Sequence, residues 1–196
     1  MIQLYNGDCL ELMKNIPDGS VDLVLCDLPY GTTRNKWDCI IPLDRLWEQY
    51  KRIIKDNGAI VLFSAEPFTS LLITSNMQWF RYDLVWAKTQ GSDFLNANRK
   101  PLRSHENICV FYKKQPTYNP QKTEGKPYKA KSGETTSSNF GKFNGNHHTE
   151  NKDGKRCPLT VLNFSGEHNK GKQHPTQKPV DLLEWIVKTY TNAEET

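Results

Sequence analysis

Residues 21–31 read VDLVLCDLPYG and carry the clearest structural signal in the chain. The first six are apolar or β-branched apart from Asp22, a composition typical of a buried strand. Asp27 and Pro29 follow at once, and both residue types favour turns. The stretch therefore predicts a strand over residues 21–26 with a rigid polar turn directly after it.

Other apolar runs and helical patterns predict the rest of the fold. Further strands are expected at residues 2–5, 59–63, 82–87 and 108–112. Helices are expected at residues 10–15, 43–54, 67–75 and 179–190, the last with Pro179 in its first turn. Asn57-Gly58 predicts a left-handed stop after the second of these helices. The alternation predicts an α/β fold with a mostly parallel sheet and with ligands at its carboxyl edge.

Length and composition exclude several protein classes. The 196 residues suffice for one mid-sized domain. No apolar run approaches the roughly 20 residues of a membrane-spanning helix, and no signal segment follows Met1, so we expect a cytoplasmic protein. The five cysteines lack paired short spacings, which predicts free thiols: Cys9, Cys26, Cys39, Cys109 and Cys157.

Charge is distributed unevenly along the chain. Residues 113–178 contain thirteen basic and five acidic residues, whereas the rest contains thirteen basic and seventeen acidic ones. After Tyr112 the apolar pattern gives way to polar residues with scattered aromatics, so we expect an insertion over residues 114–165. Its basic surplus favours contact with a polyanion such as DNA or RNA. A solvated loop without specificity is the competing interpretation.

The tetrad Asp27-Leu28-Pro29-Tyr30 suits one kind of chemistry. An exocyclic amine on a nucleobase is a poor nucleophile because its lone pair is delocalised into the ring. The Asp27 carboxylate and the Leu28 carbonyl can each accept one of its hydrogens, while Pro29 stiffens the turn. Tyr30 offers a ring on which a flipped-out base can stack. The alternative is an ordinary turn after a strand.

At these residues the chain resembles the DNA amino-methyltransferases, which methylate adenine N6 or cytosine N4 with S-adenosylmethionine. The segments follow the order of the permuted class, whose catalytic motif comes early. LVWAK at residues 84–88 and SHEN at residues 104–107 are similar to the family's later strands, which flank the target-base pocket. The resemblance implies a Rossmann-like sheet, mostly parallel with an antiparallel strand. It also implies catalytic roles for Asp27, Leu28, Pro29 and Tyr30.

The resemblance further implies a site for S-adenosylmethionine. NGDC at residues 6–9 looks like the family segment whose Asp accepts a hydrogen bond from the cofactor's adenine amine. HPTQKP at residues 174–179 and the helix after it resemble the segment that closes over the methionine end. The implied cofactor-binding residues are Asp8, Cys9, Asp27, His174, Thr176, Lys178 and Pro179.

The sequence departs from the family pattern in one respect. In the family, a strand and a Gly-rich turn that cradles the cofactor follow the last of these helices, whereas this sequence stops at Thr196. FGKFNG at residues 140–145 follows no predicted strand and does not replace that turn. We therefore expect a truncated chain, an interrupted gene or half of a split enzyme. Its sheet would be incomplete at the C-terminus, and a missing segment or partner chain would complete it.

The expected partner is double-stranded DNA with a flipped target base. Asp at the head of the tetrad is more usual for adenine enzymes of the family and Ser for cytosine enzymes, which favours adenine N6. In the loop over residues 32–38, Arg34, Lys36 and Trp37 are expected to contact DNA, although Trp37 could equally pack in the core. The insertion lies where the family carries its target-recognition region, with candidate DNA contacts at Lys126, Lys129 and Lys131.

Two other kinds of site are not supported. Several potential zinc ligands lie close together in the chain, but their spacing fits no familiar pattern, and methyl transfer from a sulfonium needs no metal: His147, His148, Cys157, His168 and His174. No Gly-x-Ser-x-Gly turn supports a hydrolase.

The working hypothesis is a bacterial or phage-encoded DNA adenine-N6 methyltransferase of the restriction-modification type. Its catalytic part would span residues 1–113, a target-recognition insertion 114–165, and a return segment with a helix 166–196. The alternatives are an N4-cytosine enzyme and an inactive DNA-binding prophage remnant. A homodimer is left open.

Overall fold

The computed structural model describes residues 2–130, 149–165 and 177–196. The chain forms two compact units. One comprises Met1–Asn119 and Leu159–Thr196, and the other comprises Pro120–Pro158. Within the described residues, no helix is long and apolar enough to cross a membrane.

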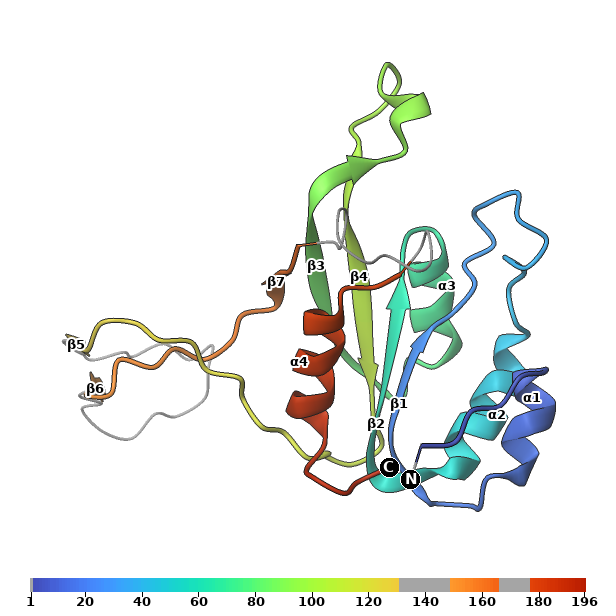
Figure 1. Ribbon diagram of the computed structural model, residues 1–196, viewed down its shortest axis with the longest axis horizontal. Helices are drawn as coiled ribbons and strands as arrows, with labels where there is room; N and C mark the ends of the chain where they lie inside the picture. The colour runs from blue at the N-terminus through green and yellow to red at the C-terminus, as the bar shows by residue number, and fades with distance from the viewer. Residues whose placement is uncertain (1, 131–148, 166–176) are drawn as a thin grey trace. The chain divides into compact units, whose positions relative to one another are not determined.

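The larger unit is built on a five-stranded sheet with the order β1-β2-β4-β3-β7 (Figure 1). β1 is parallel to β2, β7 is parallel to β3, and β4 is antiparallel to both of its neighbours. Four strands therefore run in one direction and β4 in the other, which confirms the expected mostly parallel sheet with an antiparallel strand. The strands are β1 Val21–Asp27, β2 Ile54–Ser64, β3 Phe80–Ser92, β4 Arg103–Phe111 and β7 Val161–Asn163.

Helices cover both faces of this sheet (Figure 1). Residues of α1, α2 and α3 pack into one core cluster, and residues of α4 pack into the other. The expected helices are thereby confirmed, with Pro179 as the N-cap residue of α4. They are α1 Cys9–Leu12, α2 Leu43–Ile53, α3 Phe68–Ser75 and α4 Val180–Tyr190, with 3-10 turns η1 Met13–Asn15 and η2 Phe94–Asn96.

The central strand β2 contributes to both clusters. Side chains alternate across a strand, so Ile60 and Leu62 enter the cluster of α2 and α3, whereas Val61 and Phe63 enter the cluster of α4. All four are at most 1% exposed. Burial of an apolar side chain of this kind stabilises a fold by about 1.5–3 kcal/mol. A strand buried on both faces explains why residues 59–63 are continuously apolar.

Two sequence predictions were wrong. Residues 2–5 form no strand, and Ile2 and Leu4 are 90% and 92% exposed, since the described residues offer them no strand to pair with. Asn57-Gly58 is not a helix stop: α2 ends at Ile53, and β2 runs on through Gly58 without a positive φ. Glycine is required there by close approach, because a Cβ would lie 2.9 Å from the Asp22 carbonyl oxygen.

The residues expected to form one polar insertion belong to both units. Val161–Asn163 pairs with Val85–Ala87 of β3 and so belongs to the main sheet. The smaller unit contains an antiparallel pair, β5 Tyr128–Ala130 and β6 Thr149–Asn151. Its described residues are held by Arg156, whose guanidinium lies 4.6 Å from the Tyr128 ring centroid and donates to the Gly154 carbonyl.

Candidate active site

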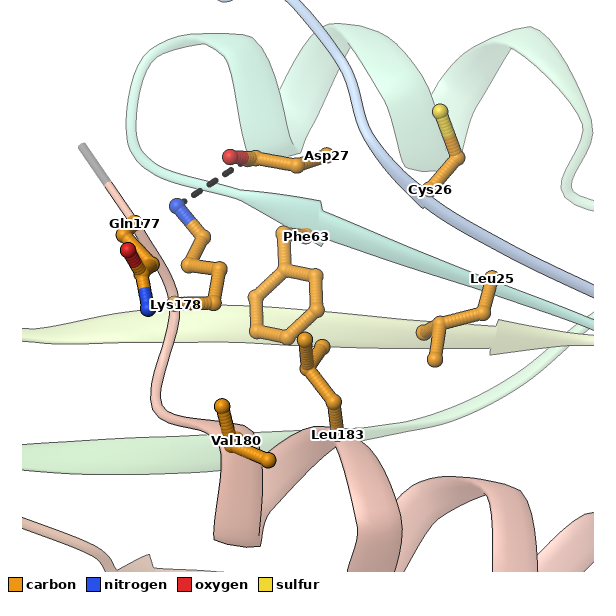
Figure 2. Close-up of a pocket in the computed structure, with 8 residues that line it drawn as sticks. All are labelled: Leu25, Cys26, Asp27, Phe63, Gln177, Lys178, Val180 and Leu183. Carbon is orange, nitrogen blue, oxygen red and sulfur yellow. Dashed lines mark ion pairs between the residues drawn. The ribbon is translucent and has the colours of Figure 1, made fainter. Parts of the chain in front are cut away.

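The turn after β1 points two neighbouring residues in opposite directions. The Leu28 side chain is 5% exposed and packs into the cluster of α2 and α3. The Asp27 side chain is 38% exposed and lines a cavity of about 450 Å³ at the carboxyl end of β1 (Figure 2). The tetrad is therefore anchored in the core by Leu28, and Asp27 is its side chain that faces the cavity. The cavity is lined by Leu25, Cys26, Asp27, Phe63, Gln177, Lys178, Val180 and Leu183.

Tyr30 contacts Asp27 through its hydroxyl group. The hydroxyl lies 2.9 Å from Asp27 Oδ1 and 3.4 Å from Glu106 Oε2. Its ring stacks on Phe68 of α3, with centroids 5.5 Å apart and planes inclined by 19°. Burial raises the pKa of Tyr30, and the charges of Glu106 and Asp27 raise it further, so the hydroxyl stays protonated and donates.

Lys178 joins the two carboxylates of the site. Its Nζ lies 3.0 Å from Asp27 Oδ1, just before α4 begins (Figure 2). The same Nζ lies 3.0 Å from Glu106 Oε2. The other oxygen of Glu106 pairs with Lys88 of β3. Two carboxylates thus face two ammonium groups, and the cluster has no net charge. Such pairing is what allows charged groups to lie this far out of water.

Glu106 is the most enclosed acid of this cluster. Its side chain is 10% exposed. Burial alone would raise its pKa, but the ammonium groups of Lys178 and Lys88 outweigh that effect and hold the pKa of Glu106 below its usual range. Glu106 is therefore an anion at neutral pH.

The contacts of Asp27 with the described residues leave one of its oxygens available. Both Tyr30 and Lys178 bind Oδ1, and in the part of the chain that the structure describes no group bonds to Oδ2. A carboxylate has about four acceptor sites, so an anchored Oδ1 fixes the direction in which Oδ2 accepts. The arrangement suits a donor group that enters the open side of the turn.

The loop after the tetrad is organised by Asp38. Its buried carboxylate accepts from the backbone N–H groups of Gly31, Thr32 and Thr33 at 2.7–2.9 Å. Burial opposes ionisation, but these hydrogen bonds and one from the Thr33 hydroxyl dominate and lower the pKa of Asp38. The loop is thus held from within, which leaves the residues at its tip free to face outward.

The tip of this loop carries the predicted DNA contacts. Arg34, Lys36 and Trp37 are all exposed, with Trp37 at 58%. The alternative of Trp37 in the core is therefore wrong. Because Asp38 takes the inward position, its neighbour in the chain points away from the core.

Substitution of Gly31 tests whether the loop requires the left-handed backbone conformation at this position. Its φ is +66°, and a Cβ would lie 2.9 Å from Ile40 Cγ1. Gly31→Ala is expected to lower the free energy of unfolding by about 1–2 kcal/mol for the left-handed backbone, plus the cost of moving Ile40. Urea denaturation measures the loss. Gly19→Ala is the matched control, since Gly19 has φ +58° and nothing within 4 Å of its Cβ. Equal losses in both variants would contradict a role for the Ile40 contact.

The predicted cofactor residues are only partly brought together. Asp8 caps α1, where its Oδ1 accepts from the Leu10 N–H at 2.8 Å, and neither Asp8 nor Cys9 is among the described residues that line the cavity. Lys178 lines it, and Pro179 is buried beside it at the start of α4. His174 and Thr176 lie outside the described residues, as do His147, His148 and His168.

Glu106, Lys88 and Gln177 are site residues that the sequence reasoning did not single out. The sequence contained a signal for Glu106, because the residues at i+2 and i+4 on its strand, Ile108 and Val110, are apolar. Both are fully buried in the structure. A carboxylate on the same face of a strand as two core residues requires a partner. Lys88 had no comparable signal, since its pairing with Glu106 depends on the register of two strands.

The predicted DNA contacts of the smaller unit are exposed basic residues. Lys126 is exposed, and Lys129 is 81% exposed with its Nζ 3.0 Å from Glu150 Oε1. Lys131 lies outside the described residues.

Comparison with known proteins places the chain in a family. A family described as DNA methylase, which groups N6 and N4 enzymes, matches residues 21–196. The chain belongs to this DNA methylase family. The match includes the tetrad, the Glu106 strand and the segment with Lys178, so the resemblance noted in the sequence is confirmed.

Curated relatives extend beyond the part that this chain matches. The type II methyltransferase M.BglII of Bacillus subtilis is 29% identical over 222 residues, which cover 98% of this chain and 57% of that protein. M.HpaI of Haemophilus parainfluenzae is 26% identical, with 97% of this chain and 60% of that protein covered. The chain therefore spans less than two thirds of the length of these two relatives.

Solved structures share the fold. The PvuII DNA methyltransferase, described as cytosine-N4-specific, aligns with a TM-score of 0.66 and 15% identity over 97% of this chain and 71% of that one. The M1.HpyAVI–SAM complex aligns with a TM-score of 0.59 and 22% identity over 100% of this chain and 80% of that one. These likenesses confirm the Rossmann-like methyltransferase fold that was expected.

Proposed function

We propose that this protein transfers a methyl group from S-adenosylmethionine to an exocyclic amine of a base in double-stranded DNA. The observation that carries the proposal is the anchoring of Asp27 at the edge of the cavity. Tyr30 and Lys178 hold Oδ1, and Oδ2 is left for a donor. A carboxylate held in this way is an acceptor whose direction is fixed before the substrate arrives.

The chemistry follows from the two acceptors of the tetrad. A target amine donates one hydrogen to Asp27 Oδ2 and the other to the Leu28 carbonyl oxygen, which draws its lone pair out of conjugation with the ring. The nitrogen can then form a bond to the methyl carbon while the carbon–sulfur bond breaks, so that a neutral thioether would leave, and the nitrogen gives up its extra proton to water. Pro29 limits the motion of the turn, and Tyr30 supplies an aromatic face for the extruded base.

The cavity fits a ligand of the size and character of S-adenosylmethionine. Its volume of about 450 Å³ lies in the range of small-molecule sites. Leu25, Phe63, Val180 and Leu183 give it apolar walls, while Gln177 and Asp27 bring polar atoms to it. When bound, the cofactor supplies an electrophilic methyl group on a sulfonium. Asp27 would therefore lie beside both the donor of the methyl group and its acceptor.

Adenine N6 is the proposed target atom, with cytosine N4 as the alternative. Asp27 at the head of the tetrad favours adenine, by likeness to the adenine enzymes of the family. The PvuII DNA methyltransferase, described as cytosine-N4-specific, shares the fold, so the fold does not distinguish the two bases. The exposed Arg34, Lys36 and Trp37 are proposed to contact the duplex beside the target base.

Mass spectrometry tests the proposal. The protein is incubated with unmethylated duplex DNA and methyl-labelled S-adenosylmethionine, and the DNA is digested to nucleosides. Labelled N6-methyl-2′-deoxyadenosine is the expected product. Labelled N4-methylcytosine would move the target to cytosine, and the absence of labelled nucleosides would contradict the proposed activity. Calorimetry with S-adenosylmethionine then separates a remnant that binds only DNA, for which no heat of cofactor binding is expected.

A further inference from the structure

Glu106 is not among the described residues that line the cavity beside the proposed catalytic carboxylate. It accepts from the Lys88 ammonium on one oxygen and from the Lys178 ammonium on the other. Its Oε2 also lies 3.4 Å from the Tyr30 hydroxyl oxygen, whose single proton is donated to Asp27 at the shorter distance of 2.9 Å. Lys178 and Tyr30 are also the two groups that hold Asp27 Oδ1. One of the two anchors of Asp27, Lys178, is therefore itself held by Glu106.

We propose that Glu106 is a positioning residue for methyl transfer, which acts on Asp27 through Lys178. This inference rests on the proposed function. Glu106 holds the Lys178 ammonium halfway between two carboxylates, at 3.0 Å from each. Without the second carboxylate, the ammonium is free to turn fully to Asp27 and to occupy Oδ2, the atom reserved for the target amine.

Charge explains why an acid is needed at this position. Lys178 and Lys88 together carry two positive charges, which Asp27 and Glu106 balance. Among the described residues, loss of the Glu106 charge leaves Asp27 as the only carboxylate paired with Lys178, and an ammonium with three donors competes strongly for a carboxylate. A glutamine keeps the shape and one acceptor oxygen but not the charge.

Glu106→Gln is the test, measured as kcat and KM for methyl transfer to duplex DNA. We expect kcat to fall about 10- to 100-fold, with KM for S-adenosylmethionine changed less than about twofold, because the misplaced group is the amine acceptor. Adding Lys178→Met to Glu106→Gln removes the competing ammonium. The double variant is expected to be faster than Glu106→Gln, by about threefold, although Lys178 also anchors Oδ1.

Asp22→Asn is the matched control. Asp22 lies on β1, the strand that ends at Asp27. Its ion pair with Lys55 has a length of 2.7 Å, and the Asp22 side chain, like that of Glu106, is largely buried. Its loss is expected to lower the melting temperature without lowering kcat. All variants are assayed at a temperature at which melting curves show them folded.

The outcomes separate the two proposals. Wild-type protein that transfers no methyl group overturns the proposed function. Wild-type protein that turns over, with Glu106→Gln at the same kcat, overturns only the positioning role. That role is also overturned if the losses from Glu106→Gln and Lys178→Met multiply, since independent effects would mean that Glu106 does not act through Lys178.

A separate observation concerns the tip of the β3–β4 hairpin, residues 93–102, which projects beyond the sheet at the same end as the loop after β1 (Figure 1). Phe94 and Leu95 are 74% and 84% exposed there. The tip is an ordered turn: Asp93 has φ +72° and its carboxylate binds Asn96 and Lys100. Exposed Arg99 follows, so the tip combines an apolar pair with positive charge.

We infer that this tip contacts duplex DNA beside the flipped base, which again rests on the proposed function. Arg99 and Lys100 match the charge of a phosphate backbone, and Arg103 fixes the base of the hairpin through the Glu66 carbonyl at 2.9 Å. Phe94 and Leu95 are the residue types that enter a duplex where a base has left the stack. An apolar pair held out on a rigid basic turn suits that partner.

Fluorescence anisotropy with a labelled duplex at several salt concentrations tests the contact. Arg99→Ala is expected to weaken binding about 3- to 10-fold and to reduce the salt slope by about one. Phe94→Ser is expected to weaken binding without changing the slope. Lys188→Ala, at an exposed position in the last turn of α4, is the control and should bind as wild type. If Arg99→Ala and Phe94→Ser both bind DNA as tightly as the control variant does, the proposed contact with DNA is overturned. The contact is also overturned if the wild-type protein is a dimer and Phe94→Ser dissociates it without changing its affinity for DNA. The tip would then bind a second copy of the chain.

Discussion

Asp27→Ala is expected to lower kcat for methyl transfer by at least about 1,000-fold and to change the affinity for duplex DNA by less than about twofold. The substitution removes the oxygen that is to accept from the target amine, and the amine then keeps its lone pair in the ring. Most DNA affinity comes from phosphate contacts made by other residues, which the substitution leaves in place. Rapid-quench methylation and anisotropy titrations measure the two quantities.

Asp27→Asn separates the role of the carboxylate of Asp27 from the size of its side chain. The amide keeps one acceptor oxygen and the size of the side chain, but its NH2 group repels Lys178 and can face the target amine with a donor. We expect a loss nearly as large as in Asp27→Ala. Retained turnover in Asp27→Ala would contradict the mechanism. A parallel loss of DNA binding would instead indicate that the turn after β1 had lost its structure.

The strand with its turn and the helices of the larger unit could be predicted because their signals are local. The apolar run before Asp27, the helix spacing over residues 43–53 and the run at residues 180–190 each report their own secondary structure. Gly58 shows where a local rule fails. The residue type was right for a tight backbone, but the cause was the approach of the Asp22 carbonyl from another strand.

The composition of the site depends on partners that are distant in sequence. Asp27, Glu106 and Lys178 meet only because β1 ends, β4 begins and the segment before α4 lies at one edge of the sheet. The likeness to the family pointed to Asp27 and Lys178, but it did not indicate that Lys178 pairs with two carboxylates. Pairing across strands cannot be read from composition when the register is unknown.

Substitution of Tyr30 is expected to have the second large effect on kcat, because its side chain is proposed both to stack on the target base and to anchor Asp27. Tyr30→Ala removes the ring that stacks on Phe68 and the hydroxyl that binds Asp27. We expect kcat to fall about 100- to 1,000-fold, from loss of both the base platform and an anchor of Asp27. The free energy of unfolding should fall by about 2–4 kcal/mol, because a large half-buried ring leaves a cavity against Phe68.

Tyr30→Phe separates the two functions. It keeps the ring and its contact with Phe68 but removes the donor to Asp27 Oδ1, so stability should change little and kcat should fall about 10-fold. If Tyr30→Phe is as slow as Tyr30→Ala, the hydroxyl anchor carries the whole effect and the ring is not a platform for the base. If Tyr30→Phe is as fast as wild type, Lys178 alone orients Asp27. A graded result, with Tyr30→Phe between the two, requires both roles, because the ring and the hydroxyl then act on different partners of the same reaction.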